Sequence, residues 1–537
     1  MKNIAFIILF TLFMVGCSDD FLTRDHPTGI TDKDFWKTTS DANNALTACY
    51  NGLPRGAYHY TAPYVSNVAL EGMTDNLYHA GNYLGDVKTI GSGTNTPSAW
   101  HPEMMWKEYY RYIRLCSRFL ENIDKPYFTD ESERQKMIAE AHILRAYYHM
   151  LLFFYFGGDE GIPIVDHALL PEEIFASRST PDEVVDFIIS DLDEAINNPD
   201  LPNKWTEDRS QRMSKAAAYS IKAIVALQGK RNNVAKAAAK AVIDMEEFEL
   251  FYTPDPEGNN FRDLFRYIGQ INNERIAYVK RGQSESWFRT MPKSMAGGQG
   301  AQNPTASIVN AFETREGKTI DEYGAEREEF IKNPLYKPRD PRLTASIWLP
   351  EQDFLGHTLT PFNGDSEDAI SKGGASKTGF CLTKFIDPED ASKTWSGNLD
   401  YVFIRYAEVL LVYVEALVES GEYNHPDVIK YLNEIRARAA MPNVDVSVYN
   451  SQEKLRELVR RERRVELAFE GQRYFDLRRW GIAKQQMEGP VYGAYNPGSE
   501  QQIIVETRVF EVPKNSYLPI PQSEIDANEN ISQNQGW

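Results

Sequence analysis

The sequence has few cysteines, no excess of positive charge and no long apolar run beyond its first residues. Its four cysteines, Cys17, Cys49, Cys116 and Cys381, are widely spaced over 537 residues, which argues against a disulfide framework or a paired-cysteine metal site. The 77 acidic residues outnumber 58 basic ones, and the net charge of −19 makes nucleic acid a poor partner because phosphate is repelled. After Val15, no stretch approaches the about 20 apolar residues of a membrane-spanning helix. The three cysteines other than Cys17 are therefore expected in the core.

The common signatures of catalysis are also missing. No HExxH, GxSxG or GxxxxGK[ST] motif occurs, and residues 298–300 (GQG) lack the third glycine and the preceding strand of a dinucleotide-binding loop. His142 and His149 are seven positions apart, which suits packing better than joint metal ligation. Four loop acids lack the alternation of an EF-hand loop: Asp365, Asp368, Asp387 and Asp390. We predict a protein that is not an enzyme, with no metal and no cofactor, although 77 acidic residues leave carboxylate pairs for glycoside hydrolysis as an open alternative.

The N-terminal residues predict export and a lipid anchor. Lys2 precedes an apolar run, residues 4–15, that is too short to span a bilayer and indicates a secretory signal peptide over residues 1–16. A small residue before Cys17 resembles the lipobox of bacterial lipoproteins, in which Cys17 would become the acylated first residue. Residues 18–20 (SDD) resemble the acidic signal that directs some lipoproteins to the outer face of the outer membrane. We expect a lipid-anchored body that faces the cell exterior.

Helical periodicity dominates two parts of the chain. From 106 to 245 the apolar residues recur at helical spacing, and residues 180–183 (TPDE) have the N-cap, the first-turn proline and the acids of a helix start. Two pairs of segments turn back at a glycine and look like tetratricopeptide hairpins: 214–227 with 233–245, and 407–418 with 426–439. The sequence therefore predicts a mostly α-helical fold with a scaffold of helical pairs at about 30–246 and 400–480.

A long segment between these parts, about 247–399, loses the helical period. It is rich in glycine, proline, asparagine and aromatic residues, with short extended runs such as 275–280. A second extended run is expected at 502–511, near the end of the chain. Long loop-rich insertions in compact proteins are usually functional, so we expect the ligand there and in the polar segment 73–98.

Three motifs resemble the SusD/RagB family of outer-membrane nutrient-binding lipoproteins. They are residues 400–416 (DYVFIRYAEVLLVYVEA), 460–480 (RRERRVELAFEGQRYFDLRRW) and 517–537 (YLPIPQSEIDANENISQNQGW), supported by 339–343 (RDPRL) in the middle of the chain. The resemblance implies a single domain over 17–537, in which tetratricopeptide-like helices carry a loop-rich ligand face. It also implies that the protein sits as a lid on a SusC-like TonB-dependent transporter. The protein itself would capture an oligosaccharide or polysaccharide without cleaving it.

Loop aromatics supply the candidate ligand site. A sugar ring has apolar C–H faces and a fringe of hydroxyl groups, so it needs a flat aromatic surface beside hydrogen-bonding groups. Six residues have this composition: Asp75, Tyr78 and Tyr83 in the first polar segment, Trp100 just after it, and Trp287 and Arg289 in the second, loop-rich segment. The resemblance makes Asp75 and Trp100 plausible counterparts of the family's ligand groups, with Trp348 and Trp395 in reserve. Aromatic surfaces also bind peptides, so a peptide or another nutrient stays an open alternative.

Charges inside apolar motifs are interpreted as structural. Arg405, Glu408 and Glu415 are expected on one face of an otherwise apolar helix. Charges in such places are usually paired with one another or with neighbouring helices. Residues 456–479 interleave eight arginines with glutamate and aspartate, which indicates a salt-bridged scaffold helix and no nucleic-acid surface.

Overall fold

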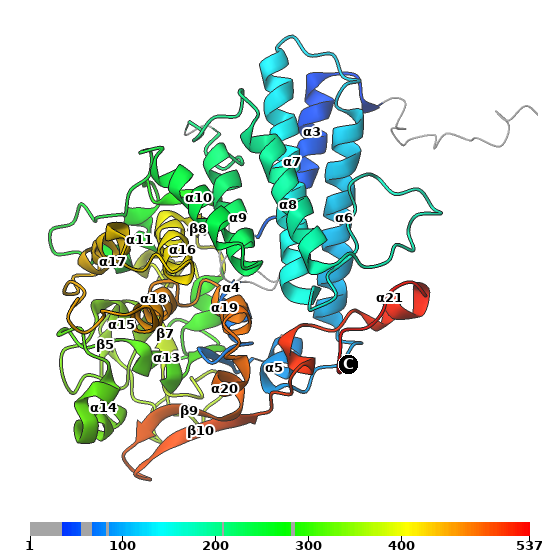
Figure 1. The fold of residues 1–537 in the computed structure, drawn as a ribbon. Coiled ribbons are helices and arrows are strands. Elements are labelled where there is room, and N and C mark those ends of the chain that lie inside the picture. Colours follow the sequence, from blue (N-terminus) through cyan, green and yellow to red (C-terminus); the bar gives the residue numbers. More distant parts are fainter. Residues whose placement is uncertain (1–34, 55–66, 82–84, 207–208, 281–284) are drawn as a thin grey trace, which may run out of the picture.

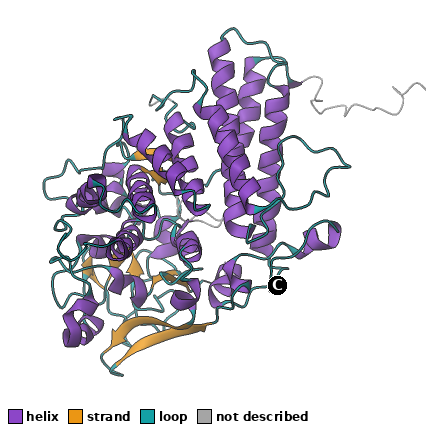
Figure 2. Ribbon diagram, viewed as in Figure 1, coloured by secondary structure: helices purple, strands orange, loops and turns teal. Residues whose placement is uncertain are grey.

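The computed structural model describes residues 35–54, 67–81, 85–206, 209–280 and 285–537. Helices are the main regular structure, and the strands form small two-stranded antiparallel sheets (Figure 2). This confirms the mostly helical fold predicted from the sequence. No helix within the described ranges is both long and apolar enough to cross a membrane. Cys17 lies outside the described residues, whereas Cys49, Cys116 and Cys381 are free and buried, as predicted.

The long helices form a continuous row. They are α3 (Thr39–Tyr50), α6 (Trp100–Asn122), α7 (Glu131–Phe156), α8 (Pro181–Ile196), α9 (Lys215–Gln228), α10 (Asn232–Ile243), α16 (Tyr406–Glu419), α17 (Pro426–Arg438) and α18 (Gln452–Glu466). Helices α6 to α10 each pack against the next one along the chain, and α10 packs against α16 (Figure 1). That last contact joins two parts of the scaffold that are far apart in sequence.

Local sequence signals account for several of these helices. The side chain of Thr180 accepts the N–H of Glu183 at 3.3 Å while Glu183 accepts the N–H of Thr180 at 2.8 Å, which caps α8 where the sequence predicted a start. Helix α7 is buried on all sides from Ile143 to Phe156, so its apolar surface covers the whole circumference there and not a single face. Tertiary packing on several sides therefore stabilises α7.

The segment 247–399 and the chain ends contain short elements. The strand pairs are β1 (Leu77–His79) with β3 (Gln302–Pro304), β2 (Arg275–Val279) with β8 (Tyr401–Arg405), β4 (Ile347–Trp348) with β7 (Cys381–Leu382), β5 (Asp353–Phe354) with β6 (His357–Thr358), and β9 (Gly489–Asn496) with β10 (Gln501–Arg508). The short helices are α4 (Asn67–Glu71), α5 (Gly85–Ser92), α11 (Asn260–Leu264), α12 (Ser286–Thr290), α13 (Ala306–Ala311), α14 (Arg327–Lys332), α15 (Pro341–Ser346), α19 (Arg473–Arg479), α20 (Ala483–Met487) and α21 (Gln522–Ala527). The 3₁₀ helices are Tyr267–Gly269, Ile320–Glu326, Pro388–Ser392 and Lys514–Ser516. The extended runs predicted at 275–280 and 502–511 correspond to β2 and β10. The domain boundaries stay a prediction.

Two predicted helices differ in the structure. Arg405 ends strand β8, and α16 begins only at Tyr406, so Arg405 and Glu408 do not share a helix. Residues 456–479 are two helices, α18 and α19, because Phe469 and Gly471 adopt positive φ angles of 66° and 84° between them. A left-handed conformation at these positions ends the helical hydrogen-bond pattern.

The charges in these motifs are paired, as the sequence predicted. Arg405 Nη1 lies 2.8 Å from Glu274 and 2.7 Å from Glu466, and its Nη2 lies 2.7 Å from Glu470. Further members of this buried network are Asp340, Arg342, Glu313, Arg436, Arg438, Glu462 and Lys384. The network joins β2, β8, α15, α17 and α18, and so fixes the loop-rich part on the helical row.

Candidate functional site

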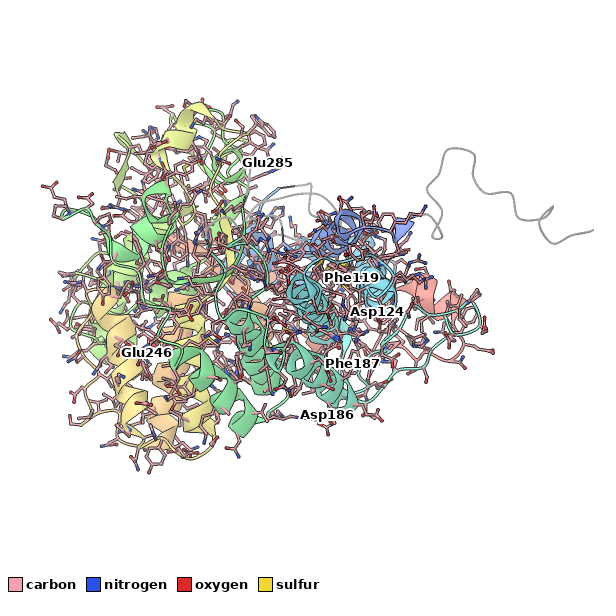
Figure 3. The ribbon with its side chains drawn as sticks, turned by 90° about the horizontal axis from the view of Figure 1, so that it is seen from above. Phe119, Asp124, Asp186, Phe187, Glu246 and Glu285 are labelled. Atoms are coloured by element: carbon pink, nitrogen blue, oxygen red, sulfur yellow. The ribbon has the colours of Figure 1, made fainter. Side chains whose placement is uncertain are left out.

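Backbone pairing brings the two polar segments together. Strand β1 pairs with β3, with Tyr78 opposite Asn303. Beyond the strands, Ala80 N–H donates to the Ala301 carbonyl at 2.8 Å, and Ala301 N–H donates to the Arg289 carbonyl at 3.0 Å. Helix α12 therefore lies beside the end of β1. Glu285, which precedes α12, is placed on the loop-rich side of the molecule, away from Phe119 and Asp186 (Figure 3).

Residues of α12 form an exposed aromatic surface together with Trp395. The rings of Phe288 and Trp395 are in contact, with centroids 3.4 Å apart and planes tilted by 31°. Phe288 N–H donates to the Thr394 carbonyl at 3.2 Å. The Arg289 guanidinium lies 5.4 Å from the Phe288 ring centroid and 6.0 Å from that of Trp395. Trp395 is 52% exposed. We call Phe288, Arg289 and Trp395 the aromatic platform.

Arg289 is held in place by its neighbours. It pairs with Glu285 at 2.7 Å, and its Nη1 donates to the Gln299 side chain at 3.4 Å. An arginine fixed in this way presents planar donors beside the platform, which suits recognition of hydroxyl oxygens.

The prediction that Trp287 forms an exposed shelf needs correction. Trp287 is 1% exposed and packs with Met291 and Ile386, and its indole N–H donates to the Met295 carbonyl at 3.3 Å. Its neighbour Phe288 is on the more exposed side of α12. Sequence reasoning missed Phe288, although its position between two predicted ligand residues was a usable signal.

Asp75 also has a structural role. It is 5% exposed, and its carboxylate contacts Arg473 at 2.8 Å and Arg464 at 2.8 Å. Burial acts to raise the pKa of Asp75, but Arg464 and Arg473 outweigh it and hold the pKa well below its usual value. Its backbone carbonyl accepts the hydroxyl of Thr305, so Asp75 fastens the first polar segment beside β3. The Asp75 carboxylate is thus paired with two arginines and has a structural role, while contact with a ligand stays a prediction.

Trp100 and Tyr78, the other aromatic candidates among the described residues of the first segment, differ in exposure. Trp100, the first residue of α6, is 52% exposed and packs edge-to-face with His101, with centroids 4.7 Å apart. Tyr78 is mostly buried, with the Lys88 ammonium 5.5 Å from its ring centroid. Trp100 thus offers a second exposed ring, whereas Tyr78 offers little surface.

His79 shows that these segments share one neighbourhood. The pKa of His79 is lowered to about 4, mainly by burial. A hydrogen bond with the Gln302 side chain acts to raise this pKa, and the positive charges of Lys88, Arg289 and His101 act to lower it. His101 is itself held by Asp86, which its Nδ1 contacts at 3.0 Å. Charged groups from both polar segments and from the start of α6 therefore lie close enough to His79 to act on its charge.

Of the remaining predicted residues, those that the structure describes do not extend the aromatic platform. Tyr83 lies outside the described residues. Trp348 is 3% exposed, and its indole N–H donates to the Gln352 carbonyl at 2.8 Å. His142 contacts Asp191 at 2.8 Å and His149 is buried against the Arg145 carbonyl, in agreement with their interpretation as packing residues. No cluster of three or more potential metal ligands occurs among the described residues.

Comparison with known proteins identifies the family. The model of the SusD family matches residues 268–537, half of the chain, and a second model, described as starch-binding and associating with the outer membrane, matches residues 30–227. The chain therefore belongs to the SusD family, which confirms the resemblance found in the sequence.

Individual relatives agree with this assignment. SusD-like protein P38 of Formosa agariphila is 25% identical over 506 residues, which cover 91% of this chain and 93% of that protein. The crystal structure of a SusD-like carbohydrate-binding protein of Bacteroides fragilis is 28% identical with a TM-score of 0.81, and the match covers 93% of this chain and 100% of that one. Surface glycan-binding protein A of Bacteroides thetaiotaomicron, solved with laminarihexaose, shares the fold at 20% identity and a TM-score of 0.68, covering 93% of this chain and 100% of that chain.

Proposed function

We propose that this protein is a cell-surface lipoprotein that binds an oligosaccharide or polysaccharide and delivers it, uncut, to a SusC-like TonB-dependent transporter. Membership of the SusD family, with a model described as starch-binding, supports the ligand class. The B. fragilis relative described as carbohydrate-binding supports it further, at 28% identity over nearly the whole chain. The signal peptide and Cys17 support anchorage in the outer membrane.

The aromatic platform is the observation that carries the proposal. A sugar can stack on the exposed face of Trp395 while the guanidinium of Arg289 and the neighbouring polar groups bind its hydroxyls. The Phe288 ring beneath Trp395 holds that indole in place, so little ordering is needed on binding. Trp100, which is 52% exposed, is the second candidate ring. Stacking contributes on the order of 1 kcal/mol a ring, which gives the modest affinity that a handover requires.

Binding to a glycan panel tests the site. In affinity electrophoresis and calorimetry, Trp395→Ala should weaken binding to the recognised glycan about tenfold, because the stacking face is lost. Trp100→Ala should weaken it less. Tyr127→Ala removes a ring that is 74% exposed at the opposite end of α6 and is the matched control, with unchanged affinity expected. Unchanged affinity in a Trp395→Ala, Trp100→Ala double variant that folds normally would exclude the platform.

The same protein tests the alternatives. A peptide mixture analysed by mass spectrometry after capture would reveal a peptide ligand, and reproducible release of reducing sugar would show a hydrolase. Cys17→Ser should release the protein from the membrane fraction and abolish labelling with a fatty-acid analogue. Retention of this variant in the outer membrane would contradict the lipid anchor.

A further inference from the structure

The two rings of the aromatic platform are held in different ways. Phe288 lies in α12, and its carbonyl accepts the N–H of Gln299 at 2.8 Å, so backbone hydrogen bonds fix its place. Trp395 lies on a loop, residues 390–398, that begins within the 3₁₀ helix Pro388–Ser392 and ends shortly before strand β8. We call these residues the Trp395 loop. The position of the Trp395 indole depends on what holds the two ends of this loop.

One phenol oxygen joins both ends of the Trp395 loop. The hydroxyl of Tyr267 donates to Asp390 Oδ1 at 2.7 Å, at the beginning of the loop, and accepts the N–H of Asn398 at 2.6 Å, at its end. Tyr267 is itself fixed, because its backbone N–H donates to Asp387 Oδ2 at 2.9 Å. The Tyr267 hydroxyl therefore closes the loop that presents the indole.

The same carboxylate also sets how closely the loop approaches. Gly397 is buried, and a Cβ added to it would lie 2.4 Å from Asp390 Oδ2. Only glycine lets the backbone come this close, because any side chain would displace the carboxylate. Asp390 thus contacts the end of the loop twice, through the Tyr267 hydroxyl and directly at Gly397.

The hydroxyl has no substitute in this arrangement. Asp390 is 2% exposed, and among the residues that the structure describes, Tyr267 is the only hydrogen-bond donor to its side chain. Burial raises the pKa of Tyr267, and Asp390 acts in the same direction while the Asn398 N–H acts to lower it, so the hydroxyl stays a donor at neutral pH. Removal of the hydroxyl would leave a buried carboxylate without a donor, and such a group is stabilised by moving toward water. The loop would then open.

We propose that Tyr267 is a positioning residue of the glycan site: its hydroxyl closes the Trp395 loop and so places the Trp395 indole against Phe288 before a glycan binds. The inference rests on the proposed function, because it concerns the same platform. A ring that is placed in advance loses little conformational freedom on binding, whereas an open loop first has to close, which weakens binding. Tyr267 therefore controls glycan affinity although its hydroxyl is already engaged within the protein.

Tyr267→Phe in the chain from Ser18 to Trp537 tests the proposal, because it removes the hydroxyl and keeps the ring. In calorimetry, its affinity for the glycan that the parent protein recognises should fall at least about threefold. Gly397→Ala disturbs the same loop from the other side and should weaken binding similarly. Asp390→Asn keeps an oxygen that accepts from the Tyr267 hydroxyl, so it should bind nearly as tightly as the parent protein, whereas Asp390→Leu should bind as weakly as Tyr267→Phe.

A signal from Trp395 itself separates positioning from a general loss of stability. The chain has nine tryptophans, and in protein labelled with 5-fluorotryptophan the ¹⁹F resonance of Trp395 is the one that Trp395→Phe removes. Without any glycan, this resonance should shift or broaden in Tyr267→Phe. The resonance of Trp106 in α6, assigned in the same way, should stay in place.

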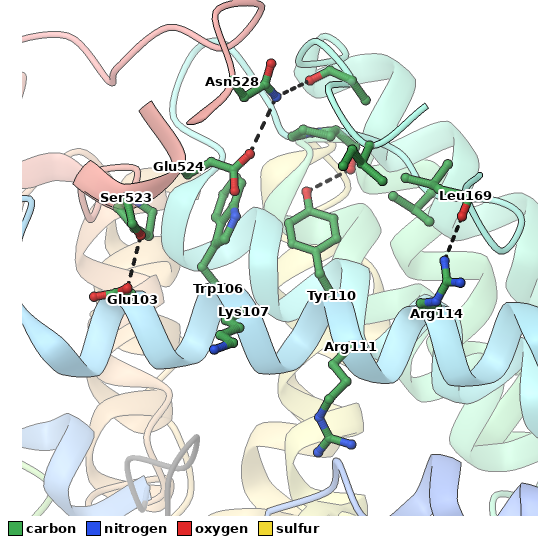
Figure 4. A pocket seen from close by; sticks show the side chains of 15 residues that line it. Glu103, Trp106, Lys107, Tyr110, Arg111, Arg114, Leu169, Ser523, Glu524 and Asn528 are labelled. Atoms are coloured by element: carbon green, nitrogen blue, oxygen red, sulfur yellow. Dashed lines mark hydrogen bonds between the residues drawn. The ribbon is translucent and has the colours of Figure 1, made fainter. Parts of the chain in front are cut away.

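Two matched variants control for the loss of a hydroxyl and for the gain of a methyl group. The hydroxyl of Tyr110 in α6 also fastens a loop, because it donates to the Pro163 carbonyl at 2.9 Å beside a cavity of about 490 Å³ (Figure 4). Gly364 is a position where an added Cβ would meet nothing within 4 Å. Tyr110→Phe and Gly364→Ala should both keep the glycan affinity and the Trp395 resonance of the parent protein.

The proposal is overturned if Tyr267→Phe binds the glycan as tightly as the parent protein, or if its Trp395 resonance is unchanged. Equal weakening by Tyr110→Phe would also overturn it, because the effect would not depend on the Trp395 loop. A failure of the proposed function gives a different result, namely normal glycan affinity in Trp395→Ala or no glycan bound by the parent protein.

Discussion

Arg405 and Glu408 are three positions apart, and their surroundings differ sharply. Arg405 contacts three carboxylates, those of Glu274, Glu466 and Glu470. Glu408 is 2% exposed and has a single ion pair, to Arg463 at 3.5 Å. Burial raises the pKa of Glu408 to about 7, and Arg463 offsets only part of this effect. The sequence predicted that both charges would be paired, but the quality of each pair depends on residues that are distant in the chain.

This difference predicts a pH effect on stability. The pKa of Glu408 is 4.5 in the unfolded state and about 7 in the folded state. At a pH between these two values, the folded state keeps a proton on Glu408 that the unfolded state has lost. The stability that the protonated Glu408 contributes is fully present below pH 4.5 and is lost as the pH rises through about 7. Relative to Glu408→Gln, the parent protein should lose about 3 kcal/mol of unfolding free energy between pH 5 and pH 8. Urea unfolding at several pH values measures this.

Glu329→Gln is the control for the change of charge. Glu329 is exposed in α14 and pairs with Lys332 at 3.3 Å on the surface, so this variant should follow the pH dependence of the parent protein. Parallel curves for Glu408→Gln and the parent protein would show that Glu408 is ionised in the folded state throughout this range.

At the scale of elements, the sequence predicted regular structure better than its interruptions. Apolar spacing and caps located α8, α9 and α16 because these signals lie within each helix. The break between α18 and α19 was missed, since the flanking arginines and glutamates all favour helix and the left-handed turn lies at Phe469 and Gly471.

Loop aromatics were predictable as a group but not individually. Trp287 and Phe288 are adjacent in α12, and the local sequence does not decide which one is buried. Their environment comes from Ile386 and Trp395, about a hundred positions further along. The same holds for Asp75, whose partners Arg464 and Arg473 belong to the second motif, 460–480.

The turn at Gly471 gives a prediction with an internal control. Gly421 and Gly471 have φ angles of 81° and 84°, but an added Cβ would meet nothing within 4 Å at Gly421, and Asn67 at 3.1 Å at Gly471. Gly421→Ala should therefore cost only the left-handed strain, about 1 kcal/mol. Gly471→Ala should cost at least about 1 kcal/mol more, because Gly471 N–H is also held by Glu71 at 3.0 Å and resists movement. Urea midpoints measure both, and equal losses would contradict a tight contact at Asn67.

On the scale of the whole molecule, one apolar core joins the helical row to the loop-rich part. It includes Leu152 of α7, Phe312 and Phe380 from the segment 247–399, and Ile520 near the end of the chain, all of them at most 2% exposed. The buried ion-pair network around Arg405 crosses the same boundary. A ligand platform built on such a core keeps its geometry because neither part can shift without breaking packed contacts in the other.

This continuity predicts that the chain from Ser18 to Trp537 unfolds in one cooperative step. Leu152→Ala in the helical row and Phe312→Ala in the loop-rich part should each remove about 3–4 kcal/mol, because both side chains are fully buried. Calorimetry should show one transition in each variant, shifted to lower temperature by a similar amount, with the calorimetric and van't Hoff enthalpies in agreement. Ile271→Ala, at a position that is 75% exposed, should leave the transition in place. Two transitions, of which Leu152→Ala moves one and Phe312→Ala the other, would mean that the two parts are separate folding units and that the shared core does not couple them.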